Sequence, residues 1–214
     1  MTVMIKAILW DNDGILVDTE RLYFLATRQV LAAIGINLTQ EIYVEFFLNQ
    51  GKGAWHLAEE RGIAPEEIAR LRNERDARYS RLLCEEALVI DGVETTLNAL
   101  SRKYVMGIVT SSQRDHFELI HQSTGLLKYF DFVITSDNYT RFKPDPEPYL
   151  VAVERTGFGK DECLAVEDSE RGLASATGAG VKCLVIPHEL TRVCSFTGAY
   201  KILNNVREVA SELL

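Results

Sequence analysis

Four carboxylate side chains follow two apolar segments that are predicted to form buried strands. Asp11 and Asp13 come directly after the first segment, and Glu167 and Asp168 come directly after the second. In an open parallel sheet, ligands bind outside the carboxyl ends of the strands, so we expect these four side chains to lie together. Clustered carboxylates repel one another unless a cation neutralises them, and their oxygen atoms suit Mg²⁺. The pattern therefore predicts a magnesium site.

Each acidic pair also has an interpretation without chemistry. Residues 11–14 contain Asp, Asn and Gly, which all favour turns, so a plain turn fits them equally well. Asp168 or Ser169 fits the N-cap of the helix expected after it. Capping and metal binding are compatible, so the second interpretation does not exclude the site.

Hydroxyl groups and a lysine follow two further predicted strands. Thr110 and Ser111 come at the end of one strand and just before a helix, where hydroxyl and backbone N–H groups bind anions or simply cap the helix. Lys143 lies in a loop with two prolines, which restrict its direction, although most loop lysines are only solvated surface. Beside clustered carboxylates, a lysine and hydroxyls can bind a phosphate while one carboxylate attacks phosphorus and another transfers protons.

Alternating strands and helices must bring these residues to one edge of a sheet. We predict an α/β fold with a Rossmann-like, three-layer parallel-sheet core and an inserted all-α cap domain. The core is expected to comprise residues 1–17 and 88–214, and the cap residues 18–87. The expected strands are 5–10, 105–109, 132–135, 163–166 and 183–186, and the expected helices are 19–34, 40–48, a short one ending at 61, 65–86, 93–102, 114–123, 148–155 and 170–177.

Composition limits the function classes. The chain has 214 residues, and its 23 Lys and Arg against 31 Asp and Glu give a net charge of −8. This acidic balance argues against a nucleic-acid or anionic-membrane surface, both of which need clustered cations. The four cysteines are widely spaced with no C-x-x-C pair, so we expect free thiols in a reducing compartment and no zinc site. No signal peptide or membrane span is recognisable, and we expect a cytoplasmic protein.

Four motifs in chain order resemble those of the haloacid dehalogenase (HAD) superfamily. They are Asp11-Asn12-Asp13-Gly14, Thr110, Lys143-Pro144 and Glu167-Asp168-Ser169. The stretch 13–20 resembles the β-phosphoglucomutase-like branch, which carries a helical cap after the first motif. The resemblance covers nearly the whole chain, and it supports the predicted fold.

The resemblance implies a role for each motif residue. Asp11 would be the nucleophile that forms an aspartyl-phosphate, and Asp13 would protonate the leaving oxygen and then activate water. Mg²⁺ would be held by Asp11, the backbone carbonyl of Asp13 and Asp168. Glu167 would orient a metal-bound water.

The phosphate would be held by the remaining motifs, namely Thr110, the Ser111 backbone and Lys143.

The residue types at a few positions differ between the branches of the superfamily. Dehalogenases lack an acid at the position of Asp13, and phosphonate-cleaving relatives replace it and use a cap lysine, for which Lys52 is a candidate. Sugar phosphomutases of this branch carry His where this chain has Tyr23, and a small residue where it has Glu20. We therefore predict a Mg²⁺-dependent phosphatase, active as a monomer on a small phosphorylated metabolite such as a sugar phosphate. A phosphomutase and a non-catalytic phosphate-binding protein remain the alternatives.

Two cations of the predicted cap are candidate substrate contacts. Lys52 lies in a Gly-flanked loop at the place of the branch's specificity loop. Arg75 interrupts the apolar stripe of helix 65–86, so it either extends from the edge of the stripe into solvent or points into the site. The stripe consists of Ile68, Leu71, Tyr79 and Leu82.

Overall fold

A six-stranded parallel sheet forms the centre of the molecule in the computed structural model, which describes residues 4–49, 53–86 and 88–214. The strand order is β3-β2-β1-β4-β5-β6, and every neighbouring pair is parallel. The predicted α/β fold with a Rossmann-like sheet is thus confirmed. The strands are β1 (Ala7–Trp10), β2 (Val105–Val109), β3 (Phe132–Ile134), β4 (Cys163–Glu167), β5 (Lys182–Val185) and β6 (Lys201–Ile202).

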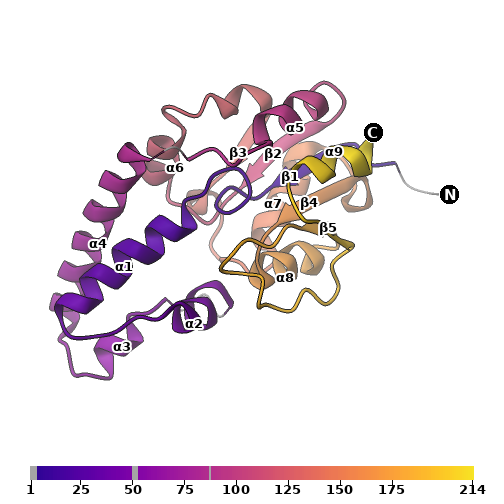
Figure 1. Ribbon diagram of the computed structural model, residues 1–214. Coiled ribbons are helices and arrows are strands. Elements are labelled where there is room, and N and C mark those ends of the chain that lie inside the picture. The colour runs from indigo at the N-terminus through magenta and orange to yellow at the C-terminus, as the bar shows by residue number, and fades with distance from the viewer. Residues whose placement is uncertain (1–3, 50–52, 87) are drawn as a thin grey trace.

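Helices cover both faces of this sheet, as Figure 1 shows. Successive side chains of a strand point to opposite faces. Ile8 and Trp10 of β1 therefore pack with α5 and α9, whereas Ala7 and Leu9 pack with α7 and α8. Both sets are fully buried, which explains why the strand reads as a continuous apolar run. The helices of this part are α5 (Val93–Leu100), α6 (Arg114–His121), α7 (Glu147–Thr156), α8 (Glu170–Gly178) and α9 (Arg207–Leu213).

A group of helices without strands lies between β1 and α5. α1 and α4 pack side by side along most of their lengths and extend away from the sheet (Figure 1). An apolar cluster joins α1, α2 and α4, and it also includes Leu190 from the loop after β5. The predicted division into a core domain and a cap domain remains a prediction. The helices of this group are α1 (Glu20–Ala33), α2 (Gln40–Tyr43), the π-helix η1 (Val44–Asn49), α3 (His56–Glu59) and α4 (Pro65–Glu85).

Local signals account for some of the helix ends. Thr39 caps α2 by accepting a hydrogen bond from the backbone N–H of Ile42. Pro65 occupies the first position of α4, where its missing N–H costs nothing. Within α4 the buried stripe ends at Leu83 rather than at the predicted Leu82, because the buried positions follow the helical period from Tyr79.

One expected helix differs from the structure, and two elements were not predicted. The single helix predicted over 40–48 divides into α2 and η1, because its hydrogen bonds change from the α to the π pattern. The strand β6 and the helix α9 were not predicted, because two strand residues and seven helix residues carry little periodic signal.

Within the described part of the chain, no helix combines the length and apolar character needed to cross a membrane.

Candidate active site

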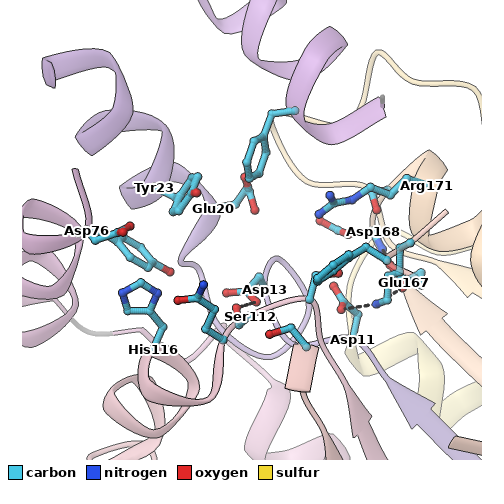
Figure 2. A pocket seen from close by; sticks show the side chains of 18 of the residues that line it. Asp11, Asp13, Glu20, Tyr23, Asp76, Ser112, His116, Glu167, Asp168 and Arg171 are labelled. Carbon is cyan, nitrogen blue, oxygen red and sulfur yellow. Dashed lines mark hydrogen bonds and ion pairs between the residues drawn. The ribbon is translucent and has the colours of Figure 1, made fainter. Parts of the chain in front are cut away.

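The carboxyl ends of three neighbouring strands carry the predicted motifs. β1 lies between β2 and β4, so Asp11 after β1 lies beside Thr110 after β2 and Glu167 at the end of β4. The backbone N–H of Asp11 donates to the carbonyl of Val166 at 2.9 Å, which continues the ladder into the site. The sheet thus brings residues 11, 110 and 167 to one edge, and Figure 2 shows the resulting pocket.

Three of the four predicted carboxylates form a buried cluster. Oxygen atoms of Asp11, Glu167 and Asp168 all lie within 4.8 Å of one another. The pKa of Asp11 is raised well above its usual value, first by burial and then by the negative charge of Glu167, while Lys143 opposes the shift. Such a set of carboxylate oxygens can hold a divalent cation.

Lys143 lies in the middle of this cluster. Its Nζ donates to Asp11 Oδ1 at 2.8 Å and to Glu167 Oε1 at 2.7 Å. A third bond at 2.8 Å goes to the backbone carbonyl of Val109. Burial alone would lower the pKa of Lys143, but the two carboxylates raise it overall, so the ammonium stays charged. The lysine predicted to be near the phosphate therefore also neutralises two acids.

Asp13 lies apart from the cluster and is held by hydroxyl groups. Its carboxylate accepts hydrogen bonds from Ser112 Oγ at 2.8 Å, from Thr110 Oγ1 at 3.2 Å and from Thr19 Oγ1. The expectation that all four acidic side chains would meet is therefore met by three, with Asp13 directed into the pocket beside them (Figure 2).

Gly14 allows the loop that carries Asp13 to pass close to the cluster. It has φ of 83°, and a Cβ atom there would lie 2.3 Å from Asp168 Oδ2. A side chain at this position would be strained and would also displace Asp168.

His188 contacts the cluster from the loop after β5. Its Nε2 lies 2.8 Å from Asp168 Oδ2. Burial lowers the pKa of His188, but the hydrogen bond and charge of Asp168 outweigh burial and raise it. His188 was not predicted, although its place just after a predicted strand is a usable signal.

A cavity of about 270 Å³ lies over these residues, between the sheet edge and the helical group. Side chains of α1 and α4 form one wall, and α6 and α8 contribute to the others. Ser111 and His116 line it on the sheet side (Figure 2 labels His116). The volume fits a small metabolite rather than a drug-sized ligand.

The predicted cap contact Arg75 lies in the cavity wall. It is buried, its Nε bonds Asp76 at 2.7 Å, and its guanidinium donates to the Tyr23 hydroxyl. The other candidate, Lys52, falls outside the described residues. The structure therefore places Arg75 at the site, already paired with a carboxylate.

Two further charged residues of the cavity, Glu20 and Arg171, were not predicted to contact the substrate. Glu20 accepts a hydrogen bond from the Tyr43 hydroxyl, and Arg171 packs over the Phe47 ring at 5.6 Å. Burial raises the pKa of Glu20 to about 7, against the lowering effects of Tyr43 and Arg171. Glu20 reaches the cavity from α1 and Arg171 reaches it from α8, and only the packed structure brings the two together.

Comparison with known proteins gives a consistent result. A family model described as haloacid dehalogenase-like hydrolase matches residues 8–186. The chain is 32% identical to YhcW of Bacillus subtilis, over 99% of its own length and 96% of that protein. It is 31% identical to a phosphorylated carbohydrates phosphatase of Thermotoga maritima, over 83% of this chain and 82% of the relative.

A solved structure agrees over nearly the whole chain. CbbY from Rhodobacter sphaeroides, in complex with xylulose-(1,5)bisphosphate, superposes with a TM-score of 0.81 at 28% identity, and the match covers 96% of both chains.

Proposed function

Because this chain belongs to the haloacid dehalogenase-like hydrolase family and is a phosphoric monoester hydrolase, we propose that it hydrolyses a small phosphomonoester. The proposed reaction depends on Mg²⁺ and passes through an aspartyl-phosphate on Asp11. One observation carries the proposal. At the cavity, Asp11 accepts a hydrogen bond from Lys143, and Asp13, two residues later, accepts hydrogen bonds from the hydroxyl groups of Thr110 and Ser112.

Asp11 is the proposed nucleophile. Lys143 bonds one carboxylate oxygen, Oδ1, and so favours the ionised form that attack on phosphorus requires. The attack forms a bond between a carboxylate oxygen of Asp11 and phosphorus, and the bond from phosphorus to the ester oxygen breaks.

Asp13 is the proposed acid and base. In the first step its carboxylic acid gives a proton to the departing ester oxygen, and the substrate alcohol leaves. In the second step its carboxylate takes a proton from a water molecule that attacks phosphorus. The bond between the Asp11 oxygen and phosphorus then breaks, which releases inorganic phosphate and restores the Asp11 carboxylate and the Asp13 carboxylic acid. Thr110 and Ser112 hold the carboxyl of Asp13 in place for both transfers.

The phosphoryl oxygens are proposed to meet donors around Asp11. Lys143 supplies the positive charge, and Thr110 and Ser111 close the end of β2. The Ser111 hydroxyl is buried and has no hydrogen-bond partner among the described residues, so it is free to donate. These donors stabilise the negative charge on the phosphoryl oxygens in the transition state.

The donor set fits Mg²⁺. Asp11 and Asp168 are buried beside each other, and all their candidate ligand atoms are hard oxygens. We propose that these two carboxylates and the Asp13 carbonyl hold the ion, with Glu167 next to it. When bound, Mg²⁺ would neutralise charge on the phosphoryl oxygens and on the acidic cluster.

A sugar phosphate is the proposed class of substrate. The cavity holds about 270 Å³, and its wall presents polar groups of Glu20, Arg75 and His116 that can bond hydroxyl groups. The T. maritima relative is named for phosphorylated carbohydrates, which supports the same class.

Phosphate release from a panel of phosphomonoesters tests the proposal. We expect release in Mg²⁺ and none after EDTA is added. Asp11→Asn should lose at least about 10³-fold in kcat, whereas Asp161→Asn, an exposed acid elsewhere, should not change it. Isomerised product without free phosphate, from a hexose 1-phosphate with its bisphosphate, would instead establish a phosphomutase.

A further inference from the structure

Arg171 lies in the cavity wall, with no hydrogen-bond or ion-pair partner among the residues that the structure describes. It belongs to the first turn of α8, and Figure 2 shows its guanidinium directed into the pocket near Asp168. Its Nε is buried and has no hydrogen-bond partner in residues 4–49, 53–86 and 88–214, and its guanidinium forms no ion pair with the carboxylates of these ranges. A buried N–H group without an acceptor is costly, so a ligand that supplies one is favoured.

The other described Lys and Arg side chains of the cavity are already engaged. Lys143 bonds Asp11 and Glu167, and Arg75 bonds Asp76. Glu20 accepts a hydrogen bond from the Tyr43 hydroxyl and none from Arg171. The charge of Arg171 only opposes the rise that burial causes in the pKa of Glu20. Among the described Lys and Arg side chains that line the cavity, Arg171 is thus the one whose N–H donors have no acceptor.

Arg171 lies where it could bind a part of the substrate other than the reacting phosphoryl group. Lys143 donates a hydrogen bond to Asp11, where the phosphoryl group is proposed to bind. Arg171 lies apart from Asp11, with Asp168 and Glu167 between them in Figure 2. Its packing on Phe47 at 5.6 Å limits the directions of the guanidinium. A planar guanidinium fits carboxylate and phosphate oxygens with two parallel bonds.

We propose that Arg171 is a specificity-determining residue that binds a second anionic group of the substrate. That group is a carboxylate or a second phosphate carried by the leaving alcohol. The inference rests on the proposed phosphatase function and narrows its substrates to phosphomonoesters with two anionic groups.

Matched substrate pairs test the proposal and separate the two kinds of anion. Glycerol 2-phosphate and 2-phosphoglycerate differ by one carboxylate, and fructose 1-phosphate and fructose 1,6-bisphosphate differ by one phosphate. For at least one pair, Arg171→Met should lower the ratio of kcat/KM, two-anion over one-anion substrate, by about 10- to 100-fold, mainly through KM. Arg192→Met removes the same charge from an exposed loop and should leave both ratios unchanged.

Binding to the Asp11→Asn variant gives a second measurement that needs no turnover. Calorimetry with the same four compounds should show that Arg171→Met weakens a two-anion member selectively. Equal weakening of both members in each pair, or none, would overturn the role of Arg171. Absence of phosphate release from every compound by the unaltered enzyme would count against the phosphatase function, and calorimetry would still decide the role of Arg171.

Discussion

The Glu20 carboxyl should make the stability of this protein fall as pH rises. Its pKa is raised from 4.5 to about 7, chiefly by burial and also by the charges of Asp13 and Asp168. Below pH 4.5 the group is protonated in the folded and the unfolded chain, so the contribution of Glu20 to stability is largest there. Between about 4.5 and 7 the unfolded chain loses the proton first, and the free energy of unfolding decreases.

The size of the effect follows from the shift. A change of about 2.5 units at 1.36 kcal/mol per unit gives an upper limit of about 3 kcal/mol. Since part of the carboxyl faces the cavity, we expect about 1 to 3 kcal/mol. Glu20→Gln removes the ionisation, and its amide oxygen can still accept the bond from Tyr43.

Urea denaturation at pH 5, 6, 7 and 8, without added metal, measures this effect. The free energy of unfolding of Glu20→Gln minus that of the unaltered protein should rise through this range and level off above pH 7. Glu60→Gln, on an exposed turn, should give a flat difference. If the Glu20→Gln difference is also constant to within about 0.5 kcal/mol, the burial argument for this carboxyl is refuted.

Two other substitutions test the acidic cluster. Gly172→Ala should destabilise the protein by about 1 to 3 kcal/mol in urea denaturation, because the new Cβ would lie 1.9 Å from Glu167 Oε2. Gly178→Ala, whose Cβ would meet its nearest atom at 3.4 Å, serves as the control, and a gain in stability from Gly172→Ala would contradict the contact. Mg²⁺ at about 100 times its Kd should stabilise the unaltered protein by about 2.7 kcal/mol. Asp168→Asn should lose most of this gain in thermal denaturation, and an equal gain would exclude Asp168 as a ligand.

Sequence patterns predicted the structure best where a short apolar run is also a buried strand of the parallel sheet. The strand predicted over 105–109 agrees with β2 at both ends, because a buried parallel strand is a short apolar run bounded by polar residues. The positions of Asp11, Thr110 and Glu167 at one edge follow from that same register of parallel strands.

Other features depend on packing that no local pattern encodes. Arg171 is one of several charged residues near a helix start, and only the unpaired Nε distinguishes it. Asp13 was expected within the metal cluster, but the hydroxyl groups of Thr19, Thr110 and Ser112 hold it to one side. Thr19 lies six residues away along the chain, so its contact appears only once the loop is folded.

The stereochemical course at phosphorus tests the central claim most directly. The substrate would carry a thiophosphoryl group made chiral with oxygen isotopes, and it would be hydrolysed in isotopically labelled water. Attack by Asp11 followed by attack by water inverts the configuration twice, so the account predicts overall retention. Inversion would show that water attacks the substrate directly, and it would contradict an aspartyl-phosphate on Asp11.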